Sequence, residues 1–144
     1  SPIVFRGNQQ LVKIRAIAFQ RHGGPEVLED LDIEIPERPP AGMVRVRVEA
    51  VALNHLDLWI RGGLPNLKVQ FPHRLGADVV GTIEAVGEGA RAPAVGTKLV
   101  VSPGVSCGVC ERCLSGRDNL CRQYGILGEH TNGGYGELLD IPVF

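Results

Sequence analysis

The sequence has few aromatic residues, almost no net charge and no long apolar run, and each shortage excludes a class of protein. Aromatic residues make up 5% of the 144-residue chain, whereas 19 glycines and 10 prolines predict many tight turns and argue against a helical bundle. The formal net charge is −1 and no basic run is present, so we expect no nucleic-acid partner. No apolar stretch approaches the ~18 residues of a transmembrane helix, so we expect no membrane partner.

The N-terminal stretch SPIVFRGNQQLVK lacks the basic start and apolar core of a signal peptide, so we predict a cytoplasmic protein. Residues 1–12 begin with Ser rather than Met and are interpreted as an N-terminal extension or a remnant of cloning. Residues 13–144 are long enough to bury the core of one domain without disulfides. No repeat or low-complexity linker divides them.

Short strands separated by Gly and Pro clusters dominate the expected secondary structure. Residues 43–52 show the clearest period-two pattern, because valines alternate with charged residues, as in a half-buried strand. The other expected strands are residues 13–19, 79–86, 96–101 and 135–141. Two short helices are expected, around residues 54–61 and 110–120. This mainly β pattern predicts a partly closed barrel or a sandwich.

All four cysteines lie in VSCGVCERCLSGRDNLC, with the spacing C-x2-C-x2-C-x7-C. Cysteines this close cannot all form unstrained disulfides, and a cytosolic compartment keeps thiols reduced. Four thiolates are the complete tetrahedral ligand set of a structural zinc, which leaves no position for water or substrate. The alternative is an iron–sulfur cluster, but the ferredoxin run continues as x3-C-P, and here seven residues intervene and an arginine follows the last cysteine. We therefore predict one structural zinc per chain, bound by Cys107, Cys110, Cys113 and Cys121.

This cysteine run resembles the structural-zinc loop of the zinc-containing medium-chain alcohol dehydrogenases. Other segments resemble that family in the same order along the chain: GGPEVLE, VALNHLDLWIRGG, GADVVGTIEAVGEGA, VGTKLVVSP and GGYGELLDIP. The resemblance covers residues 13–144 and implies the GroES-like catalytic domain of the superfamily, a distorted β-barrel with short helices and a four-cysteine zinc lobe. It also implies a small-molecule substrate, NAD or NADP as cofactor, and a homo-oligomer.

The family's Rossmann domain, which binds the nicotinamide cofactor, is expected to be absent from this chain. The G-x-G-x-x-[GA] match at residues 87–92 meets a proline instead of opening a helix, so we interpret it as a turn. We therefore expect the chain to be part of a longer parent enzyme and to show no dehydrogenase turnover alone.

The family's usual catalytic zinc is not expected to form, because two of its ligand positions are altered. Matched motif to motif, the Cys of the C-x-x-[DS] element falls on Asn54, and the His of the G-H-E element falls on Ala77. The combination N-x-x-D and G-x-D resembles the quinone oxidoreductase branch, which transfers hydride without a metal. That branch generally lacks the four-cysteine loop, so the resemblance is mixed.

Without a catalytic zinc, hydrogen-bond donors must stabilise the negative charge that develops on the substrate oxygen. By position, Asn54 is the candidate catalytic donor, Asp57 orients its neighbours, and His55 lies near a cofactor phosphate. Asn54 also fits a purely structural role, since asparagine is a favoured helix N-cap. Asp78 is interpreted as a buried, hydrogen-bonded residue, and Trp59 as a core residue rather than a substrate wall.

Three hypotheses follow for function. The leading one is the catalytic domain of an NAD(P)-dependent oxidoreductase that reduces or oxidises a small carbonyl, alcohol or quinone-like substrate. One alternative is an alcohol dehydrogenase with a rewired catalytic metal site that draws on His55, Asp57 and Asp78 together with ligands beyond Phe144. Another is a stand-alone zinc-stabilised barrel that binds partners and does no chemistry. A parent reading frame that continues into a strand and G-x-G-x-x-G would favour the enzyme.

Overall fold

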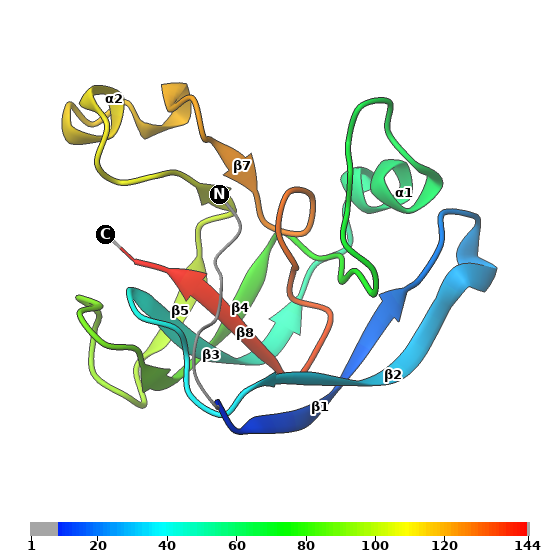
Figure 1. Ribbon diagram of the computed structural model, residues 1–144, viewed down its shortest axis with the longest axis horizontal. Helices are drawn as coiled ribbons and strands as arrows, with labels where there is room; N and C mark the ends of the chain where they lie inside the picture. The colour runs from blue at the N-terminus through cyan, green and yellow to red at the C-terminus, as the bar shows by residue number, and fades with distance from the viewer. Residues whose placement is uncertain (1–8, 144) are drawn as a thin grey trace.

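The computed structural model describes residues 9–143, and antiparallel sheets organise them (Figure 1). The largest sheet has the order β5-β4-β3-β8 and consists of β3 (Met43–Val51), β4 (Val79–Val86), β5 (Lys98–Val101) and β8 (Leu138–Pro142). A second sheet pairs β1 (Leu11–Phe19) with β2 (Leu28–Pro36), and a small one pairs β6 (Gly104–Val105) with β7 (Gly125–Ile126). The expected mainly β architecture is confirmed, although over residues 9–143 these sheets do not close into one barrel.

The helices are short and lie in the connections between strands. The structure contains α1 (His55–Gly62), the single turn α2 (Glu111–Leu114), and the 3-10 turns η1 (Pro25–Val27) and η2 (Asp118–Leu120). The helix expected at residues 54–61 is confirmed. The helix expected at 110–120 is wrong over most of its length, because Gly116 adopts a left-handed conformation with φ 73° and the chain turns there. Among the described residues, no helix is both long and apolar enough to cross a membrane.

Two clusters of buried apolar side chains form the core. The first cluster joins the strands of the large sheet to the residue after β7, and consists of Val44, Val46, Val79, Val101, Leu127 and Leu139. The second cluster joins β1, α1 and the segment before β4, and consists of Phe19, Val27, Ile60 and Leu75. Ile60 is fully buried in it, so this cluster fixes α1 against the sheets.

The strand β2 was not expected from the sequence. Its residues LEDLDIEIP alternate, but acidic side chains occupy the outward positions and weaken the apolar signal. In the structure β2 pairs with β1 along its whole length, so that Lys13 faces Glu34 and Arg15 faces Asp32. Opposite charges therefore face each other across this ribbon.

Three expected strands, at residues 13–19, 43–52 and 79–86, are confirmed, and the other two begin later than expected. β5 begins at Lys98, since Gly96 forms a turn with φ 91°. β8 begins at Leu138, because the preceding residues bridge two sheets instead. Ile17 N–H donates to the Tyr135 carbonyl over 3.0 Å, and Glu137 N–H donates to the Arg15 carbonyl over 3.1 Å.

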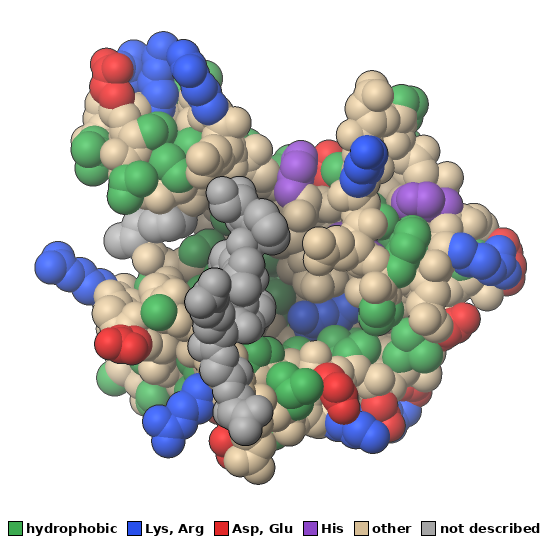
Figure 2. Space-filling model, in the orientation of Figure 1, with side chains coloured by type: hydrophobic (Ala, Val, Ile, Leu, Met, Phe, Trp, Pro, Cys, Tyr) green, Lys and Arg blue, Asp and Glu red, His purple; other side chains and the backbone are tan. Residues whose placement is uncertain are grey.

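Two smaller expectations concern the chain's connections. Of the expected N-terminal extension at residues 1–12, residues 1–8 lie outside the part described, while Leu11 and Val12 belong to β1. Residues 87–92 form an irregular turn between β4 and β5, as the sequence predicts. Figure 2 shows two projections above the sheets, the cysteine-bearing segment on one side and the α1 region on the other, with a notch between them.

Candidate functional site

The four cysteines converge in the segment of residues 104–126, here called the cysteine lobe, which projects from the large sheet (Figure 1). Their sulfur atoms all lie within 4.8 Å of one another. Cys107 Sγ is 3.8 Å and Cys110 Sγ is 3.5 Å from Cys113 Sγ. Zinc–sulfur bonds of ~2.3 Å in a tetrahedron place the sulfurs ~3.8 Å apart. The donor type, number and spacing therefore fit a four-coordinate structural zinc.

Backbone N–H groups donate to several of the sulfurs and favour the thiolate form of Cys107, whereas burial and the neighbouring thiols raise the pKa of Cys110 to about 11. Hydrogen bonds from the N–H groups of Val109 and Cys110 lower the pKa of Cys107 to about 6, and Cys110 N lies 3.4 Å from Cys107 Sγ. Gln123 N–H donates to Cys121 Sγ over 3.3 Å. Cys107 thus ionises readily at neutral pH, which is the form that binds metal.

Asp57 is the centre of the second candidate site, at the start of α1. It is buried, with 5% of its surface exposed. Its Oδ2 accepts hydrogen bonds from Asn54 N–H over 2.9 Å and from the Tyr135 hydroxyl over 3.0 Å. Its Oδ1 accepts a longer one from Gly76 N–H, over 3.3 Å. Asp57 therefore ties the N-terminus of α1 to two segments that are distant in the sequence.

Asn54 precedes α1 in an extended conformation and faces the residues before β4. Its Nδ2 donates to Asp78 Oδ2 over 2.8 Å. Asp78 is exposed, so its expected burial is wrong. Ala77 is buried at 6% exposure and offers no ligand atom. The structure thus places Asn54 against the segment that contains Ala77, and neither of these two altered motif positions carries a thiolate or an imidazole.

His55 and Trp59 lie on the outer face of α1, one helical turn apart. Their ring centroids are 5.6 Å apart, and Trp59 is 56% exposed. The expected core position of Trp59 is therefore wrong, because the inward face of this short helix carries Asp57 and Ile60 instead. Over residues 9–143, the group of ligand atoms that converges as a metal site is the four cysteines, and His55, Asp57 and Asp78 form no second one.

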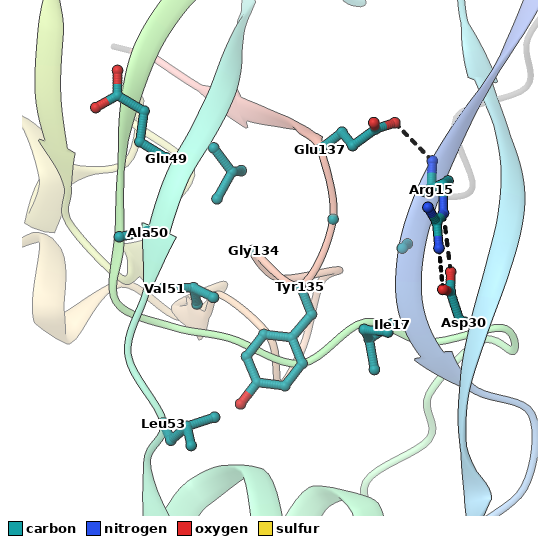
Figure 3. Close-up of a pocket in the computed structure, with 13 residues that line it drawn as sticks. Arg15, Ile17, Asp30, Glu49, Ala50, Val51, Leu53, Gly134, Tyr135 and Glu137 are labelled. Carbon is teal, nitrogen blue, oxygen red and sulfur yellow. Dashed lines mark hydrogen bonds and ion pairs between the residues drawn. The ribbon is translucent and has the colours of Figure 1, made fainter.

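Tyr135 completes the site and was not singled out from the sequence. Burial, followed by the charge of Asp57, raises the pKa of its hydroxyl. It also lines an open cavity of about 610 Å³ between β1 and β3, beside the apolar side chains of Ile17, Val51 and Leu53 (Figure 3). The segment GGYGELLDIP marks this tyrosine only as part of a strand, so its contact with Asp57, 78 positions away, carries no sequence signal.

Comparison with known proteins gives one consistent picture. The model of the alcohol dehydrogenase GroES-like domain matches residues 40–143. A solved NAD-dependent alcohol dehydrogenase is similar, with a TM-score of 0.82 and 52% sequence identity. The match covers 89% of this chain and 37% of that protein. A cobalt- and zinc-bound thermostable alcohol dehydrogenase from Pyrobaculum aerophilum is similar with a TM-score of 0.80 and 34% identity. This match covers 91% of the present chain and 40% of that protein.

Among curated proteins, a quinone oxidoreductase of Lama guanicoe is 38% identical over 134 residues, which are 91% of this chain and 38% of that protein. The chain spans only about a third of the length of the curated relatives it matches. The GroES-like fold implied by the sequence resemblance is confirmed by these matches.

Proposed function

The chain belongs to the family of the alcohol dehydrogenase GroES-like domain, and from this membership we propose that it is the substrate-side domain of an NAD(P)-dependent oxidoreductase. The observation that carries the proposal is the junction of Asn54 with residues 76–78, where a hydrogen-bonding amide stands in a position that the family resemblance assigns to a metal ligand. The proposed reaction is hydride transfer between the nicotinamide and a small carbonyl, alcohol or quinone-like substrate.

Zinc has a structural role in this proposal. Cys107, Cys110, Cys113 and Cys121 would hold one zinc ion per chain. With four protein ligands the ion has no open position for substrate, so it supplies folding energy to the cysteine lobe rather than Lewis acidity. The sulfur spacing and the N–H groups around Cys107 support this assignment.

The substrate oxygen is stabilised by polar groups of the chain. Asn54 has two amide hydrogens, and Asp78 accepts one, which fixes the amide plane and leaves the other for the oxygen that gains negative charge. Asp57 acts as a positioning residue, because its two oxygens fix the backbone of Asn54 and of Gly76. His55, exposed at the first position of α1, would contact a cofactor phosphate.

Metal content tests the metal-free reaction. Protein purified without added metal is expected to contain one zinc per chain and to release it together with four titratable thiols. Two zincs per chain would contradict the proposal and restore a metal-dependent mechanism. Iron with labile sulfide would contradict the zinc assignment of the cysteine lobe.

Activity tests the role of Asn54 in a parent enzyme that carries the cofactor-binding domain. NADH and NADPH oxidation is measured with aldehydes, ketones and quinones. Asn54→Ala is expected to lower kcat by about 10²- to 10³-fold with little change in KM, as for loss of one oxyanion donor. Asn119→Ala, at an exposed asparagine of the cysteine lobe, is the matched control. Equal rates for both variants would contradict the role of Asn54.

A further inference from the structure

Tyr135 joins three segments of the chain next to Asn54. Its hydroxyl donates to Asp57 Oδ2 over 3.0 Å, which reaches the first turn of α1. Its backbone N–H donates to the Leu75 carbonyl over 3.0 Å, and its own carbonyl accepts from the Ile17 N–H over the same distance. The side chain and the peptide groups of one residue therefore tie together α1, the segment before β4, and β1.

The ring of Tyr135 also packs directly on Gly76. A Cβ atom on Gly76 would lie 2.7 Å from Tyr135 Cδ1 and 3.0 Å from the Gly134 nitrogen, so only a glycine allows this approach. The Gly134 N–H donates to the Gly76 carbonyl over 2.9 Å. Gly134 and Tyr135 thus hold the backbone two positions before Asp78, which accepts the hydrogen bond of the Asn54 amide.

Both partners of the hydrogen bond between Asn54 and Asp78 are therefore held from Tyr135. On one side, the Tyr135 hydroxyl and the Asn54 N–H share Asp57 Oδ2, and this carboxylate fixes the start of α1. On the other side, the Tyr135 ring fixes the backbone that leads to Asp78. Asp57 is 5% exposed, so little water reaches it to replace a lost donor. Burial and, after it, the charge of Asp57 raise the pKa of Tyr135, which keeps the hydroxyl protonated at neutral pH.

We propose that Tyr135 is a positioning residue for the Asn54 donor and acts through Asp57 and the backbone that carries Asp78. The inference rests on the proposed role of Asn54 in hydride transfer and extends it to a residue 78 positions beyond Asp57. A contact misplaced by about 1 Å can cost about 10²-fold in rate. Loss of the Tyr135 hydroxyl should therefore lower kcat, although the Asn54 side chain itself is still present.

A double-mutant cycle in the parent enzyme tests the proposal. Tyr135→Phe is expected to lower kcat by about tenfold or more, with KM for the nicotinamide cofactor unchanged. In the Asn54→Ala background the same change should alter kcat by less than about twofold, because a positioning residue has no effect once the group that it positions is gone. Tyr124→Phe, at the exposed tyrosine of the cysteine lobe, is the matched control and should leave kcat unchanged in both backgrounds.

The cavity beside Tyr135 permits a second test by chemical rescue. Tyr135 lines this open cavity of about 610 Å³, so the space vacated in Tyr135→Ala is reachable from solvent (Figure 3). Phenol supplies both the ring and the hydroxyl, whereas toluene supplies the ring alone. Phenol should raise the kcat of Tyr135→Ala in a saturable way, and toluene should not.

The outcomes separate the role of Tyr135 from the function on which it rests. An unchanged kcat in Asn54→Ala would overturn both. A slow Asn54→Ala enzyme, together with Tyr135→Phe at the wild-type rate, would overturn the role of Tyr135 alone. So would an equal effect of Tyr135→Phe in the two backgrounds, or equal rescue of Tyr135→Ala by phenol and toluene. If Tyr135→Ala does not fold, the cycle with Tyr135→Phe decides.

Discussion

The cysteine lobe and the large sheet reach order by different physical means. In the lobe, neither α2 nor η2 buries a residue, and Val109, Leu114 and Leu120 are exposed at 76%, 76% and 53%. In the large sheet, Val46 and Ile83 are at most 1% exposed. The lobe therefore depends on its sulfur ligands and backbone hydrogen bonds, whereas the sheet depends on apolar burial. Changes that remove one kind of support should leave the other region intact.

Cys113→Ser is expected to have the largest effect. Structural zinc sites have apparent binding free energies on the order of 10 kcal/mol or more, and a lobe without a buried core has no substitute for them. The variant should lose its zinc and its amide-exchange protection over residues 104–126, while β3 and β4 stay protected. Hydrogen exchange with mass spectrometry and elemental analysis measure both. Ser115→Ala, at an exposed lobe position, should keep zinc and protection. Loss of amide-exchange protection throughout the chain would show that the cysteine lobe and the large sheet are not stabilised independently.

Ile83→Ala tests the large sheet, which depends on apolar burial. Its side chain is 1% exposed, so truncation should lower the free energy of unfolding by about 2–4 kcal/mol, while Ile83→Val should cost about 1 kcal/mol. Urea unfolding gives the two values. Zinc content should stay at one per chain in both variants. Release of zinc at native temperature from Ile83→Ala would show that the two regions are coupled.

Asp57→Asn tests a third kind of support, a buried carboxylate whose hydrogen bonds depend neither on metal ligands nor on apolar burial. An amide has one oxygen for three donors, so we expect a loss of about 2 kcal/mol in unfolding free energy. The variant should also lower the pKa of the Tyr135 hydroxyl toward 10, because the charge of Asp57 helps to raise it. Ultraviolet titration in a Tyr124→Phe background isolates Tyr135. An unchanged titration would mean that burial alone sets this pKa, and Tyr135→Phe is the control for the lost hydroxyl.

His73 gives the smallest expected effect, visible as a pH dependence. It is 3% exposed, its Nε2 lies 2.9 Å from the Gly128 carbonyl, and burial lowers its pKa below the ordinary 6.5. Below pH 6.5 the unfolded chain binds the proton more tightly than the folded one, so stability should fall as the pH drops. His73→Gln should flatten this part of the profile of unfolding free energy between about pH 5 and pH 7. Parallel profiles for wild type and His73→Gln would remove His73 as the cause.

The sequence predicted what depends on local pattern. The cysteine spacing predicted which sulfurs converge, and the alternation around Val46 predicted the central strand. It failed where long-range contacts decide the outcome. Arg45 belongs to the polar face of its strand by alternation, yet it is 2% exposed, because Asp140 on β8 and the carbonyls of Pro36 and Glu37 at the end of β2 give each of its three side-chain nitrogens a partner. The same holds for Tyr135, whose partner on α1 no local pattern could reveal.

The predictions for residues 110–120 and for β2 failed for a different reason. The helix expected at residues 110–120 is limited to the single turn Glu111–Leu114, because Gly116 adopts a left-handed conformation that ends it. In β2, the acidic outward positions weakened a period-two pattern that is plainly present in LEDLDIEIP. In the candidate site, Asn54 and Asp57 could be chosen from the motif, but the exposure of Trp59 depends on which side of α1 faces the core. Asp78 is exposed because it lies between Ala77 and Val79, whose side chains are the buried ones.

The position of β8 has a consequence for folding order during synthesis. β8 pairs with β3, and its ion pair with β3 joins residues 95 positions apart. Tyr135, just before it, bonds to residues on β1, on α1 and at Leu75. Contacts of such high sequence separation slow folding, because a long loop must close before they form. Until residues 138–142 have been synthesised, the edge of β3 that β8 covers stays free and can pair with other chains. A truncation before Leu138 is therefore expected to aggregate rather than to yield a smaller folded domain.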